Sequence, residues 1–301
     1  MKSNSLSIIV PCYNSSKRIV GCINAIKLSI ESLPNKLLCE IIVVNDGSKD
    51  KTEEIIKGID GITMVSYSKN RGLSAARNSG INASNSEYIA FIDSDIIVEK
   101  TWFQKTLNLL IDDSSIVGVT GYLKKPLTKQ TKSLLDIYLF SHYRGTKNID
   151  NKTSLLYKWF VFSNTIIRRS LLERTGHFDE RLKSYGGEDT ELSIRINKDF
   201  SKNLRKDCGA VAYHYSDKSL NQYMRNMYDY GLNNFNHIIE KHPSYKKELG
   251  GNLPKSFIGY LIFNPINTFL CSSILKCIKH PLLIKFLVIN SFVKGVRNFK
   301  K

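Results

Sequence analysis

The sequence lacks several features that define other classes of protein. Its six cysteines are scattered, with no Cys-x-x-Cys pair and no spacing typical of a zinc site, so we interpret them as small core side chains in a reducing compartment. The first apolar run, Leu6–Val10, is too short for a signal peptide and is followed by Pro11. We therefore expect the chain to start in the cytoplasm. The sequence contains no internal repeat and no low-complexity segment.

Acidic residues are missing from the last part of the chain. From Leu249 to Lys301 the sequence has no Asp or Glu but has eight Lys and Arg residues, within a formal net charge of +17 for all 301 residues. The most basic part of the chain is therefore also rich in aliphatic side chains. Hydrophobic residues make up 42% and charged residues 24% of the whole chain, which is the composition of an ordinary folded protein.

Strands and helices are expected to alternate along the first hundred residues. Short runs rich in β-branched residues predict strands at Leu6–Val10, Glu40–Val44, Thr63–Ser66 and Tyr88–Ile92. Apolar residues at helical spacing predict helices at Ile19–Ile30, Glu53–Ile59 and Leu73–Ala83. This alternation is typical of an α/β fold in which helices cover both faces of a mostly parallel sheet. Farther along we expect strands and helices at Ile116–Thr120, Val211–Tyr215, Trp102–Leu110, Leu134–Tyr143, Thr190–Asn197 and 219–240.

Polar residues follow three of the predicted strands. Pro11–Asn14 follows the first strand, Asn45–Ser48 the second and Asp93–Asp95 the fourth. Ligands of such sheets bind beyond the carboxyl ends of the strands, so we expect one composite site there. The Asp-x-Asp spacing of Asp93 and Asp95 offers hard oxygen ligands to a divalent ion beside phosphate oxygens. Taken alone, each of these segments is also typical of a turn or a helix cap.

Five blocks of residues together carry a resemblance to a known family. In chain order they are Ser7–Asn14, Ile41–Thr52, Asn70–Gly80, Phe91–Asp95 and Gly187–Arg195. In this order they resemble family 2 glycosyltransferases with the GT-A fold, over roughly residues 5–235. The resemblance implies a doubly wound, mostly parallel sheet that binds a nucleotide sugar, followed here by a helical, basic and apolar C-terminal extension.

The resemblance also implies roles for individual residues. It places Pro11, Tyr13 and Asp46 near the nucleotide base of the donor, the Arg71–Asn78 segment with Arg71, Arg77 and Asn78 along the ribose and diphosphate, and Asp93 near the ribose. It also implies that Asn14 and Ser94 take part in donor binding. It further implies that Asp95 binds Mn²⁺ or Mg²⁺, which would stabilise the charge on the departing nucleoside diphosphate.

The acidic pair Glu188-Asp189 matches the family motif in which the Asp serves as catalytic base. A sugar hydroxyl is a poor nucleophile, so a nearby carboxylate must take its proton, and attack opposite the leaving group inverts the anomeric carbon. The alternative is that both acids only stabilise a helix N-terminus. Some relatives use a His after the acidic helix as a metal ligand, which implies this role for His214. A core histidine is the alternative for His214, and His177 receives no role.

The leading hypothesis is an inverting enzyme that moves one sugar, from a UDP-sugar in preference, to a hydroxyl of a lipid-linked glycan acceptor in surface polysaccharide synthesis. The segment Gln222–Asn226 has no tryptophan, whereas processive synthases carry Gln-x-x-Arg-Trp, so single addition is favoured. Alternatives are a polyprenyl-phosphate sugar transferase, a catalytically inactive binding module and, from the isoelectric point near 9.5, a nucleic-acid-binding protein. Basic residues mixed with aliphatic ones form no nucleic-acid motif, so we expect no nucleic-acid partner.

These roles divide the expected domains at residue 218. Residues 1–218 form the GT-A catalytic domain, with 1–98 as its nucleotide-binding half and 99–218 as its acceptor half, and residues 219–301 form a helical extension. Within this extension, Ser256–Leu275 is an uncharged run long enough to span a bilayer, but polar residues and Pro265 interrupt its middle. We expect residues from about 253 to lie on the anionic inner face of the cell membrane. The alternative is packing on the catalytic domain or in an oligomer.

Overall fold

The structure is a computed structural model that describes residues 2–33, 37–126, 133–144 and 154–299. Its contacts divide the chain into two compact units. Unit 1 consists of Met1–Pro126, Thr146–Glu180 and Glu188–Ser216, and unit 2 consists of Leu127–Gly145, Arg181–Gly187 and Asp217–Lys301. The predicted functional division at residue 218 stays a prediction. The structure assigns two short segments from before that division, 127–145 and 181–187, to unit 2.

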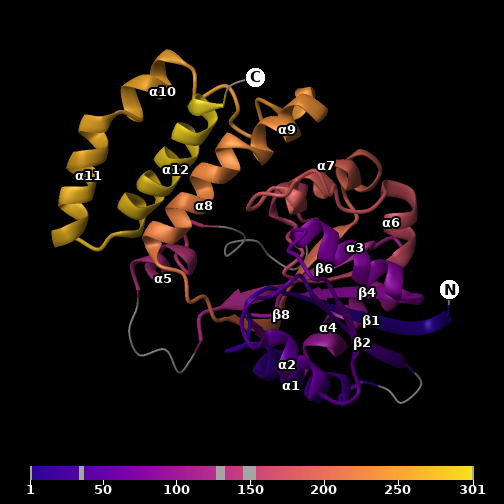
Figure 1. The fold of residues 1–301 in the computed structure, drawn as a ribbon. Helices are drawn as coiled ribbons and strands as arrows, with labels where there is room; N and C mark the ends of the chain where they lie inside the picture. Colours follow the sequence, from indigo (N-terminus) through magenta and orange to yellow (C-terminus); the bar gives the residue numbers. More distant parts are fainter. Residues whose placement is uncertain (1, 34–36, 127–132, 145–153, 300–301) are drawn as a thin grey trace. The chain divides into compact units, whose positions relative to one another are not determined.

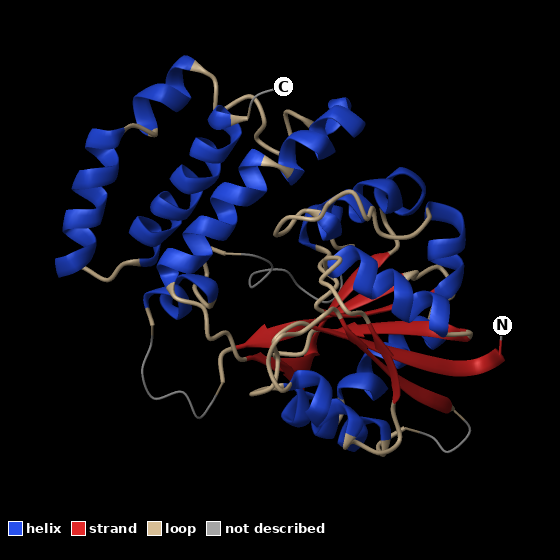
Figure 2. Cartoon of the chain, viewed as in Figure 1, coloured by secondary structure: helices blue, strands red, loops and turns tan. Residues whose placement is uncertain are grey.

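Unit 1 is built on one eight-stranded sheet, drawn in red in Figure 2. The strands lie in the order β3-β2-β1-β4-β7-β6-β8-β5. In chain order they are β1 Lys2–Cys12, β2 Leu38–Asn45, β3 Thr63–Ser66, β4 Ser86–Ile92, β5 Ile96–Val98, β6 Gly118–Lys124, β7 Asn164–Arg168 and β8 Leu204–His214.

Parallel pairing joins the strands that carry the predicted site. β1 pairs in parallel with β2 and β4, and β2 pairs in parallel with β3. The carboxyl ends of these four strands therefore meet at one edge of the sheet. On the other side of β4 the sheet is mixed, because β7 is antiparallel to both β4 and β6. The predicted α/β class with a mostly parallel sheet is confirmed.

Helices cover both faces of this sheet (Figure 1). One face packs against α1 Ile19–Ile30, α2 Thr52–Lys57 and α4 Trp102–Asp112, and the other against α3 Leu73–Ala83, α6 Arg169–Thr175 and α7 Glu188–Phe200. A short 3-10 turn, η1 Tyr157–Trp159, adds to the second layer. β1 shows why two cores form: Ile8 and Val10 point into the first core and Ile9 into the second, and all three are fully buried.

The described residues of unit 2 form helices and no strands. The helices are α5 Leu134–Leu139, α8 Leu220–Leu232, α9 Asn234–Lys241, η2 Pro243–Tyr245, α10 Phe257–Ile262, α11 Pro265–Cys277 and α12 Pro281–Asn298. The predicted helical C-terminal extension is confirmed. Glycines let α8 and α12 cross closely, since a Cβ on Gly295 would lie 2.1 Å from the Tyr228 carbonyl oxygen. Among the described residues, no helix combines the length and the hydrophobicity that crossing a bilayer requires.

Two predicted helices are shorter than expected because polar side chains bond to the backbone. The single helix predicted over 219–240 is broken at Asn233, whose side-chain amide donates to the Asp229 carbonyl oxygen at 3.1 Å. The helix predicted over Leu134–Tyr143 ends at Leu139, and the Ser141 hydroxyl donates to the Tyr138 carbonyl oxygen at 2.8 Å. The sequence patterns do not predict the short elements β5 and α6 or the first half of β8.

Candidate active site

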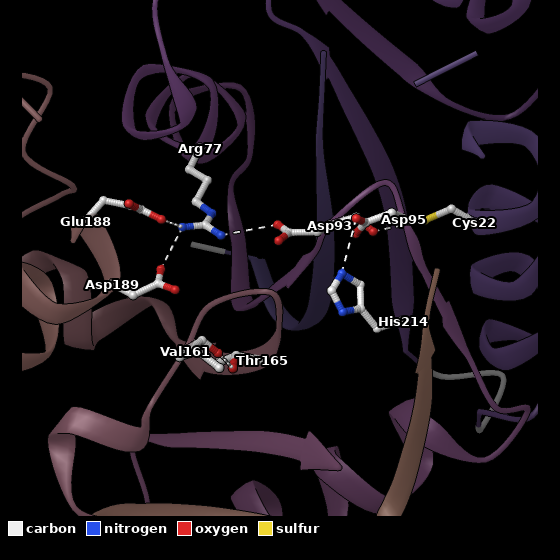
Figure 3. A network of polar contacts seen from close by, with 9 residues as sticks. All are labelled: Cys22, Arg77, Asp93, Asp95, Val161, Thr165, Glu188, Asp189 and His214. Carbon is white, nitrogen blue, oxygen red and sulfur yellow. Dashed lines mark hydrogen bonds and ion pairs between the residues drawn. The ribbon is translucent and has the colours of Figure 1, made fainter. Parts of the chain in front are cut away.

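The buried guanidinium of Arg77 brings together acids from distant parts of unit 1 (Figure 3). Arg77 lies on α3, and one of its terminal nitrogens is 2.7 Å from Asp189 Oδ1 and 3.4 Å from Glu188 Oε1. The other terminal nitrogen donates to Asp93 Oδ1 at 3.2 Å. The Asp-x-Asp segment after β4 and the acidic pair that opens α7 therefore share one cation.

Arg77 stays charged although its side chain is only 1% exposed. The three neighbouring carboxylates raise its pKa, and they outweigh the opposing effect of burial. Its guanidinium also lies over the ring of Phe178, 5.2 Å from the ring centre. That ring meets Phe91 and Phe162 edge to face at 5.6 and 5.0 Å, so the cation rests on a packed aromatic layer.

Two of the acids around Arg77, Glu188 and Asp93, have raised pKa values. Burial raises the pKa of Glu188 from 4.5 to about 7, with a further contribution from Asp189 and against the lowering effect of Arg77. Burial likewise raises the pKa of Asp93 to about 6, with Arg77 opposing and with Asp95 and Asp189 adding to the rise. One guanidinium is thus too little positive charge for the carboxylates that share this site.

Asp95 and His214 form a second cluster next to the first. His214 Nε2 lies 3.2 Å from Asp95 Oδ2, with the two side chains 26% and 35% exposed. The antiparallel pairing of β5 with β8 sets this contact, because Ile96 pairs with His214 and the Tyr215 N–H donates to the Asp95 carbonyl oxygen at 2.9 Å. The structure therefore places together the two residues that the resemblance assigned to the metal.

The donor set fits Mn²⁺ or Mg²⁺ as a site that a substrate completes. A carboxylate and an imidazole suit Mn²⁺, and both side chains are accessible. In the part of the chain that the structure describes, no group of three or more His, Cys, Asp and Glu side chains is placed to hold a metal ion. Diphosphate oxygens and water would have to provide the remaining ligands, as is usual for Mg²⁺ at phosphate sites.

The carboxylate of Asp46 organises the loop that precedes α3. Asp46 is 4% exposed, and its two oxygens accept hydrogen bonds from the N–H groups of Arg71 and Gly72 at 2.7 and 2.9 Å and from the Asn70 side chain at 2.8 Å. Gly47 follows with a φ of +66°, and a Cβ there would lie 2.4 Å from the Lys69 backbone. Contact of Asp46 with a nucleotide base stays a prediction, and the structure adds this loop-fixing role.

Asn78 also bonds within the protein. Its side-chain amide donates to the Phe178 carbonyl oxygen and to Glu180 at 3.0 and 2.9 Å, and its oxygen accepts from the Phe178 N–H at 3.0 Å. Glu180 also accepts from Arg71 at 3.3 Å. No pattern in the sequence points to Phe178 or Glu180, because both act through contacts about 100 residues away along the chain.

The remaining predicted donor-binding residues lie at the ends of β1 and β4. Pro11 is buried within β1, and Tyr13, just beyond it, is 45% exposed. Asn14 has a φ of +50° and is tied to the loop after β2, since its N–H donates to Ser48 Oγ at 3.0 Å. The hydroxyl of Ser94 lies 2.8 Å from that of Ser15. These contacts connect the segments that follow β1, β2 and β4 into one continuous rim at the carboxyl edge of the sheet.

A sequence profile of Glycosyl transferase family 2 matches residues 7–176. The chain belongs to this family. This glycosyltransferase is 30% identical over 227 residues to the uncharacterised glycosyltransferase EpsJ of Bacillus subtilis strain 168, covering 72% of this chain and 63% of EpsJ. It is 26% identical over 246 residues to chondroitin synthase of Escherichia coli, covering 70% of this chain and 34% of that protein. The chain therefore spans between one third and two thirds of the length of these relatives.

Two solved structures share the fold at low sequence identity. The mannosyltransferase PcManGT from Pyrobaculum calidifontis, in complex with GDP-Man and Mn²⁺, has a TM-score of 0.64 at 17% identity and covers 98% of this chain and 88% of its own. Residues 1–349 of TarS from S. aureus, in complex with UDP, have a TM-score of 0.56 at 18% identity and cover 97% of this chain and 90% of their own. The predicted GT-A fold is confirmed.

Replacing Arg77 by Met should strongly destabilise the glycosyltransferase. The variant leaves Glu188 and Asp93 with no cation, and breaking a buried ion pair in this way costs about 3–5 kcal/mol. Urea unfolding measures the loss. Arg71→Met is the matched control, because its pair with Glu180 is half exposed and such pairs contribute about 0–1 kcal/mol. Equal stability of the two variants would contradict the central role of Arg77.

The stability of the protein should fall as the pH rises from about 4.5 to 7. Because the pKa of Glu188 is raised in the folded state, the folded protein binds more protons than the unfolded chain in this window, and the slope of stability with pH is negative. Glu188→Gln should remove on the order of 2 kcal/mol of this fall. Urea unfolding across this pH range measures it, with Glu173→Gln on the exposed side of α6 as the control. An unchanged slope in Glu188→Gln would refute the assignment.

Proposed function

We propose that the protein transfers one sugar from a nucleoside-diphosphate sugar to a hydroxyl group of a glycan acceptor, with inversion at the anomeric carbon. The observation that carries the proposal is the meeting of Asp93 with Glu188 and Asp189 at Arg77. In a family 2 chain this puts the Asp-x-Asp segment and the acidic pair of α7 at one edge of the sheet, as a donor and an acceptor sharing one site require.

Asp189 is the proposed base. Its Oδ1 is held by Arg77 at 2.7 Å, and its side chain is 21% exposed, which leaves the carboxylate in reach of an acceptor. Its other oxygen, Oδ2, would take the proton of the attacking hydroxyl as the glycosidic bond forms and the bond to the diphosphate breaks. Arg77 keeps the carboxylate in place.

Asp95 and His214 would hold a Mn²⁺ or Mg²⁺ ion together with the diphosphate of the donor. Such an ion supplies positive charge where the departing nucleoside diphosphate gathers negative charge. Support comes from the 3.2 Å approach of the two side chains and from the fold shared with PcManGT, whose structure contains GDP-Man and Mn²⁺.

We favour a UDP-sugar donor and a lipid-linked glycan acceptor at the cytoplasmic face of the membrane. TarS, which shares the fold, has been solved with UDP, and one relative is a chondroitin synthase. A polyprenyl-phosphate sugar transferase is a weaker candidate, because a phosphate acceptor needs no base and the acidic pair would then have no task. Assays that offer polyprenyl phosphate as the sole acceptor separate the two.

Asp189→Asn should keep donor binding and lose transfer. A missing general base lowers the rate by roughly two to four orders of magnitude, while the donor makes its contacts elsewhere. A panel of UDP- and GDP-sugars is first screened for protection against thermal unfolding. Affinity and sugar transfer, or donor hydrolysis, are then measured with the best donor. Asp199→Asn, on an exposed position of the same helix, is the control, and wild-type rates in Asp189→Asn would refute the assignment.

Asp95→Asn and His214→Gln should weaken Mn²⁺ binding in the presence of UDP. Each removes one of the two protein ligands, so we expect at least a tenfold loss of affinity, the lower end of the range for disturbed metal sites. Electron paramagnetic resonance of free Mn²⁺ measures binding without relying on turnover. Asp112→Asn at the exposed end of α4 is the control. Unchanged Mn²⁺ affinity in Asp95→Asn would exclude the proposed site.

A further inference from the structure

Helix α11 carries both buried and exposed apolar side chains. Cys271 and Leu275 are buried against α12, where the Cys271 thiol donates to the Leu283 carbonyl oxygen at 3.3 Å. Four further apolar residues recur at helical spacing but are 45 to 71% exposed: Ile266, Phe269, Leu270 and Ile274. A helix of a soluble domain usually turns polar residues to solvent, so these exposed side chains indicate a binding partner.

Helix α10 continues the exposed apolar surface. Phe257 is 84% exposed, and Ile258 and Leu261 are 60% and 63% exposed. We call these three residues and the four exposed residues of α11 the apolar face. The same helices and α12 border a groove with a volume of about 660 Å³, lined mostly by aliphatic side chains together with Phe286, Asn264 and Asn267. Exposed apolar surface of this kind marks a binding site for another molecule or for lipid.

The polar residues between α10 and α11 bond to the backbone of the helix break. The Asn267 amide donates to the carbonyl oxygens of Leu261 and Ile262 at 3.0 and 2.9 Å, and the Asn264 amide also donates to Leu261 at 2.7 Å. The Asn264 oxygen accepts from the Asn267 N–H at 2.9 Å. In the sequence alone, these polar residues argue against burial in hydrocarbon. Because they satisfy the backbone groups of the break, they lower the cost of placing it in an apolar medium.

Cations flank the apolar face, and no acid accompanies them in the sequence from Leu249 on. Lys255 precedes α10, Lys276 lies in the last turn of α11, and Lys279 follows it, and all three are exposed. Arg297 is used internally, since its guanidinium donates to the carbonyl oxygens of Pro254 and Phe263 at 2.7 and 2.6 Å. The surface thus presents apolar side chains beside positive charge alone, which complements an anionic lipid surface.

We propose that the apolar face inserts into the headgroup region of an anionic bilayer, with Lys255, Lys276 and Lys279 at lipid phosphates and an acyl chain in the groove. The positive charge favours lipid over a second copy of the chain as the partner. Two copies would bring their lysines together with no acids nearby in the sequence, whereas lipid phosphates are negatively charged. Membrane binding of this kind is independent of sugar transfer, so either proposal can fail alone.

The full-length protein is sedimented with vesicles of phosphatidylcholine alone and with vesicles that contain about 30% phosphatidylglycerol. We expect retention on the anionic vesicles only, and a large loss in about 0.5 M NaCl. Phe257→Ser/Phe269→Ser should lower the partition coefficient roughly tenfold or more. The matched control is Leu38→Ser/Ile111→Ser, which removes two side chains of unit 1 that are 62% and 56% exposed.

Lys276→Gln/Lys279→Gln tests the charge and should lower the partition coefficient roughly fivefold for each lysine. Lys198→Gln/Lys202→Gln, at exposed positions of unit 1, should leave it unchanged. Circular dichroism and thermal unfolding verify that each variant is folded. Equal retention of Phe257→Ser/Phe269→Ser and wild type overturns the proposal. The proposal is also overturned if light scattering shows a dimer that these substitutions abolish while vesicle binding stays unchanged.

Discussion

The ion cluster around Arg77 is the constraint on which unit 1 depends. A guanidinium that is 1% exposed is stable only where carboxylates surround it, and here they come from the end of β4 and from the start of α7. The ring of Phe178 lies beneath it, and the Phe178 backbone is hydrogen-bonded to the side-chain amide of Asn78, one residue farther along α3. One helix turn thereby fixes the acids at the start of α7 relative to Asp93 after β4, which is the geometry that the proposed transfer reaction would need.

The same cluster is short of positive charge, and this shortage shapes the chemistry. Asp93, Asp95, Glu188 and Asp189 lie around a single guanidinium and an imidazole, and the raised pKa values of Glu188 and Asp93 follow from burial and mutual repulsion. A diphosphate would add further negative charge at this rim. The proposed divalent ion would offset this charge when a donor binds. The charge balance of the site is therefore an argument for the proposed ion that does not depend on the fold shared with PcManGT.

Local patterns predict most of the fold, and the family resemblance implies the residues of the candidate site, but neither predicts which residues meet. The strand ends and α3 follow from β-branched runs and helical spacing. The contact between Asp95 and His214 depends on the antiparallel pairing of β5, three residues long, with β8. Pairing across more than 100 residues leaves no periodic signal in the sequence. Asp46 and Asn78 show the same limit, because a donor-binding residue and a residue that fixes a loop look alike in a motif.

The two units differ in how far their apolar side chains are buried, and the polar residues beside those side chains differ as well. In unit 1, helices bury both faces of the sheet. The polar residues of the candidate site lie instead at the carboxyl ends of the strands. In unit 2, α12 buries Ile284, Leu287 and Val288, whereas α10 and α11 leave large side chains exposed. An exposed apolar helix pair in water would be expected to carry charges of both signs for solubility. In α10 and α11, side-chain amides instead bond to the backbone groups at the helix break, and the charges beside these helices are positive only. Both features suit the proposed contact with an anionic lipid surface better than exposure to bulk water.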